Sequence, residues 1–500
     1  MGVFGLTCVL MAIGYLVTFF PHKGVGKVEE RHGVDGLEMM QKTVEVMRSK
    51  GLETGRKLTP NAWRDLMRGS DRMEWAICFG CVIDLSTFAQ SHPGGAHMLG
   101  HFVGRDMTPW VVITHAKTQR ALATLPALVV GLIDASPDPV LSFSPALLAP
   151  VDQEYLRRVW ELANKGWLAY PLLWSIRDAL EVAIPHIVGL FCIFRLRVLT
   201  LGILFLGLGG IRAVYWAHDV LHGEATRTER EGMRLVWWVS MAVLGFDFSH
   251  FTIDHKVHHG FTNLIGLDKA VDVPFVPFHQ IQVESGSNPG VGDTLRRMGF
   301  ANVLFFVCLS PLLATSYLVD GMRYRYVLKK QSVWPWGVVE VLRLGSMFVF
   351  WEYQWPFLLE SFLVSFATGL VATLNHPHRP MDLPEQFFSQ ENAESTLYSF
   401  VALQVSGNSN QTNHNLSGSD VVHSLRGHFD LHIEHHLFPF LPRRRYGEIA
   451  ETTRSWLLSH SLPYEVQPMT KAFLSFNRTM QTPHTRRLVS PLSNCPDAMS

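Results

Sequence analysis

Three clusters of histidine constrain this 500-residue chain more than any other feature. The clusters are HDVLH at 218–222, HKVHH at 255–259 and HIEHH at 432–436. On a helix, residues at i, i+3 and i+4 share one face, so each cluster can direct its side chains at one point. The histidines are His218, His222, His255, His258, His259, His432, His435 and His436. These eight imidazoles could therefore converge on metal.

The number of histidines indicates more than one metal ion. A catalytic zinc usually takes three protein ligands and a structural zinc takes four, so eight histidines exceed the need of one such ion. A single cluster is compatible with an ordinary structural role, but three together favour a metal centre. Because imidazole suits iron, copper, nickel and zinc alike, the identity of the metal must come from other chemistry in the chain.

A haem site is predicted from residues 75–99, WAICFGCVIDLSTFAQSHPGGAHML. A short apolar strand over Ala76–Val82 leads to a polar turn, and the glycines after Pro93 permit close backbone approach to a flat ligand. His92 is the candidate for one axial ligand, and His115, 23 residues downstream, is the candidate for the other. Since no C-x-x-C-H occurs, the haem would be held without thioether links.

This arrangement resembles cytochrome b5 over roughly Gly55 to Asp134. His97 and His101 are rival ligands, for which a core or surface role is favoured. The stretch after HPGG is poor in carboxylates, and Asp106 is its only acid before Lys117. Because members of that family often carry an acidic rim there for docking a reductase, the identity of the electron donor stays open.

The composition excludes several other classes of protein. Basic and acidic residues both number 43, and zero formal charge argues against a nucleic-acid binder. Six cysteines in this length are not a disulfide framework. Cys78 and Cys81 form one C-x-x-C, which cannot complete a four-thiolate site alone, so ordinary packing is predicted for them. The chain has no P-loop, Gly-x-Ser-x-Gly elbow or dinucleotide fingerprint, so any NADH would be used by a separate reductase.

Hydrophobic segments separate the histidine clusters and predict a membrane domain. Because the clusters must lie on one side of the membrane to share a centre, the chain must cross an even number of times between them. One hairpin is predicted before the first cluster and a second before the third. The hairpin segments are Ala183–Phe194 with Val198–Tyr215, and Gly337–Trp351 with Leu358–Leu374. Val303–Val319 and Leu235–Leu244 are then interfacial or partly embedded helices.

Basic residues indicate which side carries the histidines. They precede the second hairpin at 323–330 and follow the third cluster at 443–445, which favours a cytosolic location. Arg195 and Arg197, in the turn of the first hairpin, favour the opposite orientation. The apolar residues 1–20 are predicted to be an uncleaved anchor, with a mispredicted start or a removed targeting segment as the alternatives.

The connecting segments complete the domain prediction. Gly36–Leu58 is interpreted as a charged linker, Ala135–Pro150 as a proline-punctuated connection and Asp152–Trp167 as an amphipathic helix leading to the membrane. The predicted divisions are an anchor and linker at 1–54, the haem domain at 55–134, a linker with a helix at 135–166, the membrane domain at 167–450 and a tail at 451–500.

The order of these parts, with E-Y-L-R-R at 154–158 and L-F-P after the third cluster, resembles the cytochrome b5-fused front-end fatty acid and sphingolipid desaturases. The resemblance spans about Gly55 to Arg445. It implies a mainly α protein: a small α+β haem domain, then an α-helical integral membrane domain with two transmembrane hairpins and a cytosolic histidine cap. The implied location is the endoplasmic reticulum, with both sites facing the cytosol.

The resemblance also implies the chemistry. Two non-haem iron ions would be held by the histidines and haem b by His92 and His115. Dioxygen would be the co-substrate, and electrons would come from NADH or NADPH through cytochrome b5 reductase or an equivalent. The reaction would introduce a cis double bond into a lipid acyl chain in the bilayer. The alternatives are a cytochrome b5-fused lipid or sphingolipid hydroxylase and, from another class, a non-enzymatic haem-binding electron carrier.

Further site residues follow from the resemblance. TLNHPHRPM offers His376 as a ninth metal ligand, with Asn375 as the holder of a bridging water and His378 as a substitute ligand. His428 would support the metal ligands without binding the metal, or have a structural role. His432 departs from the family, in which glutamine is usual at that position. This change preserves a metal ligand but leaves the regiochemical class open.

Metal-bound imidazoles need partners on their other ring nitrogen. The candidates among the carboxylates are Asp219, Asp254, Asp430 and Glu434, with ordinary solvation on a helix surface as the alternative. Asn410 and Asn415 lie in N-x-S/T sequons and are expected to stay unglycosylated on the cytosolic side.

Overall fold

The structure is a computed structural model that describes residues 36–68, 73–92, 95–116, 118–223, 251–268, 359, 363–364, 367, 374–376, 379, 381–388, 399–412, 423 and 427–481. The chain divides into two compact units. The smaller unit comprises residues 1–33, 169–255 and 303–372, and the larger unit comprises residues 34–168, 256–302 and 373–500.

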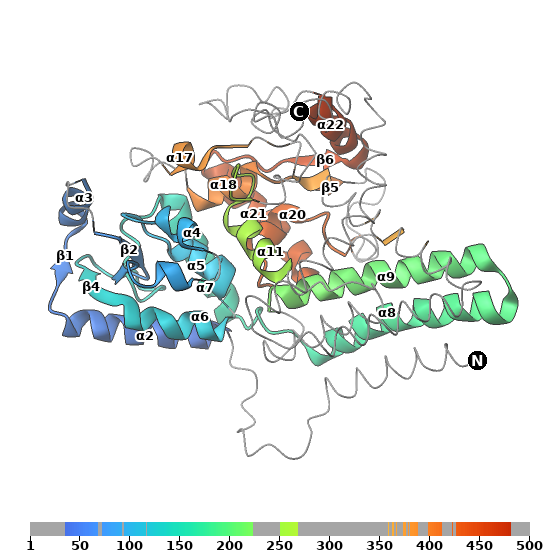
Figure 1. Cartoon of the computed structure of the whole chain (residues 1–500), viewed down its shortest axis with the longest axis horizontal. Helices are drawn as coiled ribbons and strands as arrows, with labels where there is room; N and C mark the ends of the chain where they lie inside the picture. Colours follow the sequence, from blue (N-terminus) through green and yellow to red (C-terminus); the bar gives the residue numbers. More distant parts are fainter. Residues whose placement is uncertain are drawn as a thin grey trace, which may run out of the picture. The chain divides into compact units, whose positions relative to one another are not determined.

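The larger unit begins with a domain built on a four-stranded sheet in the order β1 (Lys57–Leu58), β4 (Val129–Ile133), β3 (Cys81–Asp84), β2 (Trp75–Cys78) (Figure 1). Strand β1 pairs with β4 in parallel, and the other neighbours are antiparallel. The helices of this domain are α3 (Pro60–Arg68), α4 (Ala96–Gly100), α5 (Thr108–His115) and α6 (Gln119–Thr124). Short 3-10 turns cover Ala89–Ser91 and Leu125–Leu128. The predicted α+β domain is therefore present.

The apolar run at 76–82 is a hairpin and not the single strand that the sequence predicted. Phe79 and Gly80 have φ angles of 52° and 69°, which suit a two-residue hairpin turn. Apolar residues on both sides of this turn hide it from a pattern search. Cys78 lies opposite Cys81 in the pairing, and both are buried free thiols. Their predicted role in packing is confirmed.

Residues 36–53 form helix α2 (Gly36–Glu53), so the interpretation of this segment as a charged linker is wrong. Met40, Val44 and Met47 are at most 3% exposed and follow helical spacing along one face. This face joins the main hydrophobic core, and the helix packs against β4 and α6. Charged residues on the opposite face gave the segment its polar composition.

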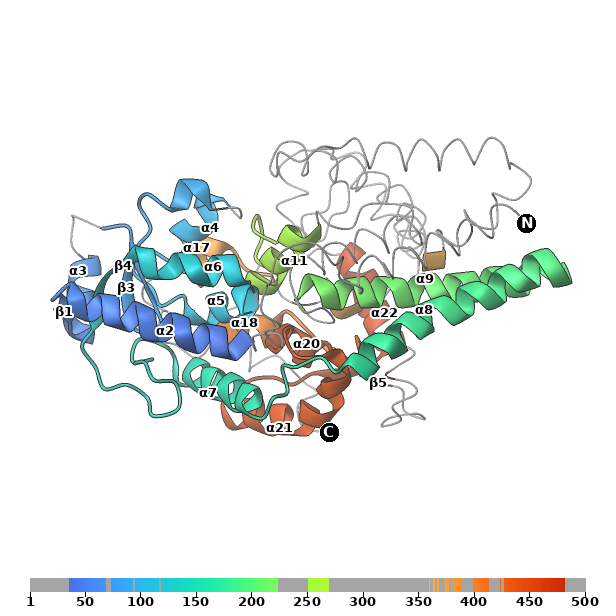
Figure 2. The ribbon, with the colours of Figure 1, turned by 90° about the horizontal axis from the view of Figure 1, so that it is seen from below.

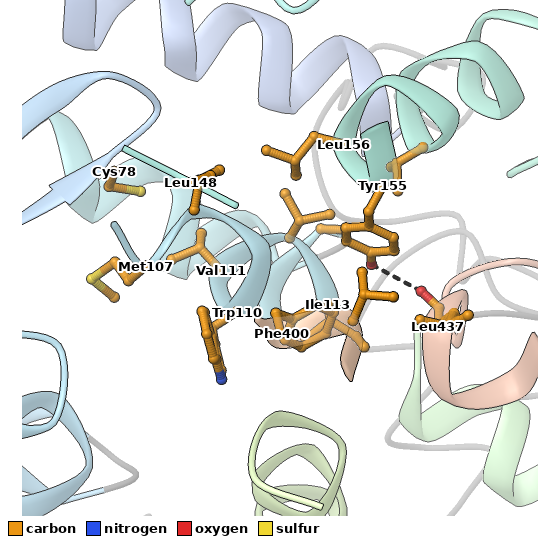
Figure 3. Packing of buried hydrophobic residues seen from close by; sticks show 14 of the residues in the cluster. Cys78, Met107, Trp110, Val111, Ile113, Leu148, Tyr155, Leu156, Phe400 and Leu437 are labelled. Carbon is orange, nitrogen blue, oxygen red and sulfur yellow. Dashed lines mark hydrogen bonds between the residues drawn. The ribbon is translucent and has the colours of Figure 1, made fainter. Parts of the chain in front are cut away.

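Helix α7 (Pro150–Asn164) confirms the helix predicted after the proline-punctuated connection. Its buried side is mainly apolar, and the Tyr155 hydroxyl donates a hydrogen bond to the carbonyl oxygen of Leu437, at 2.8 Å (Figure 3). The same helix reaches α18 (Phe400–Ser406), because the Asp152 carboxylate accepts the backbone N–H groups of Phe400 and Val401, each at 3.0 Å. Helix α7 thus connects the four-stranded domain to the segments that carry the third histidine cluster.

The other elements of the larger unit lie mostly in the C-terminal third of the chain. Helix α17 (Pro384–Phe387) and helix α20 (His432–Leu437) are short, and a 3-10 turn at Arg443–Arg445 leads into α21 (Tyr446–Ser459). Strands β5 (Asn410–Thr412) and β6 (Val466–Pro468) pair in parallel, and α22 (Met469–Gln481) follows. Helix α11 (Phe251–Gly260) carries the second histidine cluster.

Two long helices of the smaller unit lie side by side in Figures 1 and 2. They are α8 (Leu172–Phe191) and α9 (Leu199–Leu221), joined by a π-helical turn at Cys192–Leu196 and by Arg197 in the left-handed region, with φ 62°. Helix α8, with its π turn, and α9 are long and apolar enough to cross a membrane. Together they correspond to the first predicted hairpin.

Helix α8 starts at Leu172 rather than at the predicted Ala183. The charges in its first turns lowered the apparent hydrophobicity, but Arg177 pairs with Glu181 one turn later, at 2.8 Å. The second predicted hairpin, apart from a few single residues, and the segments 1–20, 235–244 and 303–319 lie outside the described residues.

We expect Asp152→Ala to destabilise the larger unit. The variant leaves two buried backbone N–H groups without their acceptor, which costs about 2 kcal/mol or more of unfolding free energy. Thermal unfolding in detergent measures the loss. Glu161→Ala, which removes an exposed carboxylate from the same helix, should leave the transition within about 0.5 kcal/mol of wild type.

The unfolding free energy that is lost in Asp152→Ala should also depend on pH. Burial raises the pKa of Asp152 from 3.8 to about 7, so the folded protein holds a proton there that the unfolded chain releases. The stability supplied by this group is then greatest at low pH and declines as the pH rises to 7. The difference between wild type and Asp152→Ala should be larger at pH 5 than at pH 8; the opposite order would contradict the assignment.

Candidate metal centre and haem site

His92 and His115 face each other in the haem domain. His92 follows the 3-10 turn at Ala89–Ser91, and His115 is the last residue of α5. Their ring centroids are 6.3 Å apart, with the ring planes at 87°. A metal about 2 Å from a nitrogen of each ring would set such centroids about 6 Å apart. The observed spacing therefore suits one metal ion between the two imidazoles.

The protonation of these two rings also suits metal ligation. The Nδ1 atoms of His92 and His115 are buried and have no hydrogen-bond partner among the described residues. Burial lowers the pKa of both side chains, that of His115 to about 3, so both stay neutral at pH 7. The rival candidates lie elsewhere: His97 is exposed, and His101 stacks on Phe388 at 5.2 Å.

The smaller unit brings three histidines together. His218 lies in the last turn of α9, His222 directly follows that helix, and His255 lies on α11. The Nε2 atom of His255 is 2.7 Å from that of His218 and 2.9 Å from that of His222. Three imidazole nitrogens thus point at one place, as the i, i+4 spacing of the first cluster predicted.

The larger unit brings together a second group of six histidines. The Nε2 atom of His376 is 3.2 Å from that of His258 and 2.6 Å from that of His432. His436 stacks on His259 with ring centroids 4.2 Å apart, and the rings of His259 and His435 are 4.6 Å apart. His258, His376 and His436 have ligand nitrogens close enough to share one metal ion.

Hydrogen bonds fix the orientation of several rings in this group. Nδ1 of His258 lies 2.9 Å and 3.0 Å from the two carboxylate oxygens of Asp268, and Nδ1 of His376 lies 3.2 Å from the carbonyl oxygen of Gly407. Both partners can only accept, so in each neutral ring the proton is on Nδ1. The lone pair of each Nε2 is then available to a metal.

His436 has the same tautomer for a different reason. The Gln404 side chain donates from its nitrogen to the carbonyl oxygen of His259, at 2.7 Å, so its oxygen is the acceptor facing Nδ1 of His436, at 3.1 Å. The Thr262 hydroxyl, 3.2 Å from the same nitrogen, donates to the carbonyl oxygen of His258, at 2.8 Å. Burial and the neighbouring histidines lower the pKa of His436, which keeps the ring neutral.

A cation is the natural occupant of this group. In their neutral forms, His258 and His376 would point two lone pairs at each other across 3.2 Å in a buried place, which is unfavourable without positive charge between them. Neutral imidazole is a common ligand of iron, zinc and copper.

Two models of protein families match this chain. Residues 195–468 match the fatty acid desaturase family, and residues 64–134 match the cytochrome b5-like haem/steroid binding domain. The chain belongs to the fatty acid desaturase family. Fatty acid desaturase 3 of Bos taurus is 23% identical, with 82% of this chain and 89% of that protein aligned. A Delta(5) fatty acid desaturase of Caenorhabditis elegans is 24% identical over 77% and 89%. A Delta(8)-fatty-acid desaturase of Euglena gracilis is 23% identical over 75% and 87%.

The carboxylate that hydrogen-bonds to the proposed ligand His258 was not among the predicted ones. Asp268 is fully buried and binds His258, whereas the Asp219 carboxylate is 3.9 Å from Nδ1 of His218, too far for a hydrogen bond. Asp430 binds His423 at 2.6 Å. Asp268 lies ten residues after His258, beyond a turn at Asn263 with φ 58°, so helical spacing within the cluster could not reveal it.

Glu434 supports the third cluster without touching a histidine. Its carboxylate accepts hydrogen bonds from the Asn410 amide and the Tyr464 hydroxyl, both at 2.8 Å. The Asn410 oxygen in turn accepts the backbone N–H of Ile433, at 2.8 Å. This network is buried, so the alternative of a solvated helix surface is wrong for Glu434. Tyr464 lies in the segment that was assigned to the tail.

The other predicted polar residues have protein partners. The Asn375 amide donates to the carbonyl oxygen of Phe429, at 3.3 Å, and its oxygen accepts from Gln411, at 2.7 Å. His428 is buried with φ 61° and stacks near His423 at 6.0 Å, which agrees with a structural role. His378 lies outside the described residues.

We expect Asp268→Asn to weaken metal binding by the desaturase about 10-fold or more, because a partner that orients a metal-bound histidine typically has this effect. Iron per chain, measured under competition with a chelator, tests the expectation. Glu451→Gln removes an exposed carboxylate of α21 and should leave the iron content unchanged. Equal iron retention in both variants would show that Asp268 does not orient a ligand.

Proposed function

We propose that this protein is an oxygen-dependent fatty acyl desaturase that introduces a cis double bond into a lipid acyl chain at a histidine-held pair of iron ions. The observation that carries the proposal is the pair of Nε2 atoms of His258 and His376, 3.2 Å apart with both protons directed away. When bound, the iron ions supply the activation of dioxygen that removes two hydrogens from neighbouring methylenes and yields water.

The proposed iron ligands are the histidines of the three clusters together with His376. They are His218, His222, His255, His258, His259, His376, His432, His435 and His436. Helix α11 contributes three of them. On this helix, His255 and His258 are less than one helical turn apart.

The side chains around these ligands prepare the site before any metal binds. Asp268, Gln404 and the carbonyl of Gly407 each place an acceptor at Nδ1 of a ligand ring, which favours the tautomer whose Nε2 can bind a metal. His432 contributes an imidazole where glutamine is usual in front-end desaturases, and its Nε2 lies 2.6 Å from that of His376. The retained ligand chemistry supports an active metal site and does not decide the position of the double bond.

We propose further that His92 and His115 hold haem b, through which electrons reach the iron ions from NADH or NADPH and a separate reductase. Their spacing and their buried, unpartnered nitrogens support this role. Asp106 provides no acidic docking surface for that reductase, because it is buried and accepts hydrogen bonds from the backbone and hydroxyl of Thr108. The docking surface must use other residues.

The proposed substrate is an acyl lipid of the membrane, in the endoplasmic reticulum with the histidines on the cytosolic side. Helices α8 and α9 support a membrane location, because large apolar side chains on them are exposed. These include Leu173, Leu180, Ile184, Ile187, Phe191, Leu201 and Leu204. Such a surface is stable in lipid rather than in water.

Expression in yeast tests the proposed reaction. Cells fed with candidate fatty acids should accumulate a product with one additional double bond, located by mass spectrometry. We expect His258→Ala and His435→Ala to reduce conversion to the background of cells without the gene, whereas His97→Ala should retain it. A hydroxylated product would indicate the related hydroxylase reaction, and full activity of either cluster variant would refute the proposed centre.

Haem content tests the proposed role of the haem domain separately. We expect His92→Ala and His115→Ala to lose the visible haem absorption band, because each removes one of the two residues that would hold the haem. His97→Ala and His101→Ala remove imidazoles that face elsewhere and should keep the band. A haem band that survives in both His92→Ala and His115→Ala would require another pair of ligands.

A further inference from the structure

Within the larger unit, helix α5, which carries the proposed haem ligand His115, is in direct contact with the end of helix α11, which carries proposed iron ligands. On α5, the indole N–H of Trp110 donates a buried hydrogen bond to the carbonyl oxygen of Gly260, the last residue of α11, at 2.8 Å. A second link joins Lys256 of α11 to the Thr118 hydroxyl, at 2.9 Å. In Figure 3, the Trp110 nitrogen points away from Val111 and Leu148, out of the core of the haem domain.

The contact lies next to the proposed ligands in sequence. A Cβ atom added at Gly260 would be 3.6 Å from the methyl group of Thr114 and 3.8 Å from the Trp110 ring, so side chains of α5 lie directly beside Gly260. Thr114 directly precedes His115, and Gly260 directly follows His259. Thr114 therefore adjoins the proposed haem ligand His115, and Gly260 adjoins the proposed iron ligand His259.

Aromatic packing holds the contact in place. The Trp110 ring lies 5.2 Å from Phe102 and 5.1 Å from Phe400 between centroids, and Phe388 lies 6.1 Å away. Phe102 also packs against Phe261, at 5.8 Å. Such aromatic pairs add about 0.5–1.5 kcal/mol each beyond their buried area. A buried apolar interface thus holds the haem domain against the segments that contain Phe261, Phe388 and Phe400.

We propose that Trp110 and Gly260 form a fixed bridge for electron transfer, so that electrons cross from the haem domain without its undocking. The proposal rests on the function proposed above. With haem and iron bound, each transfer would oxidise one haem iron from ferrous to ferric and reduce one histidine-bound iron from ferric to ferrous. No bond in Trp110 forms or breaks; this residue positions α5 against α11, and the external reductase restores the ferrous haem.

The test compares two tryptophan variants of the full-length protein. Trp110→Phe keeps an aromatic ring among its neighbours but removes the hydrogen bond to Gly260. Trp63→Phe is the matched control, because Trp63 donates a similar bond to the carbonyl oxygen of Gly104 within the haem domain, at 3.3 Å. Haem and iron content are measured for both, and both should match wild type.

The first readout is the rate of haem oxidation after reduced protein is mixed with dioxygen and a fatty acyl substrate in a stopped-flow instrument. Iron-depleted wild type gives the baseline of direct haem oxidation. We expect Trp110→Phe to slow the iron-dependent phase about fivefold or more, a factor equivalent to about 1 kcal/mol. Trp63→Phe should stay within twofold of wild type.

The second readout is hydrogen exchange of residues 256–262 in the purified protein, which we expect to be faster in Trp110→Phe and unchanged in Trp63→Phe. If Trp110→Phe fails to keep its haem, Gly260→Val provides the test, because its side chain would push Thr114 and Trp110 away from α11. Oxidation as fast as wild type in a variant with intact haem and iron overturns the bridge. Wild type without an iron-dependent phase would instead refute the proposed function.

Discussion

Buried imidazoles whose Nε2 atoms face one another are the constraint on which the rest of this structure depends. In the larger unit, His258 and His376 each place their proton on an acceptor behind the ring and leave Nε2 facing Nε2 across 3.2 Å. A protein interior tolerates this arrangement only around positive charge. The surrounding helices and loops hold these rings in a fixed register, which is the arrangement that the proposed iron ions need.

The supports of the histidines extend far beyond the clusters. Gln404 of α18 joins the carbonyl of His259 to the ring of His436, so α18 fixes α11 and α20 relative to each other. Asp152 of the linker helix α7 holds the first N–H groups of α18. The helix that follows the haem domain is thus part of the support of the metal site. This explains why a linker contains a buried carboxylate and a buried tyrosine.

The sequence was most informative where the spacing of residues and the chemistry of their side chains indicate the same site. The spacing within each histidine cluster predicted which rings share a face, and HPGG with a second histidine predicted the facing pair in the haem domain. The sequence did not reveal features that depend on tertiary contacts. The buried face of α2 was hidden by its charges, the Phe79–Gly80 turn by apolar neighbours, and the partnership of Asp268 with His258 by a loop that returns to the helix. The close approach of Trp110 to Gly260 depends on two segments 150 residues apart, which no local pattern relates.

The parallel pairing of β5 with β6 has a consequence for how the protein is made. Helix α20 is synthesised before Tyr464 and β6, yet its Glu434 is held by Tyr464, and β5 needs β6 as its partner. The third histidine cluster therefore reaches its final form only after the ribosome has passed β6. Binding of the proposed iron ions would then be a late event in biogenesis, and a nascent chain halted before β6 would present its histidines on an unsupported helix.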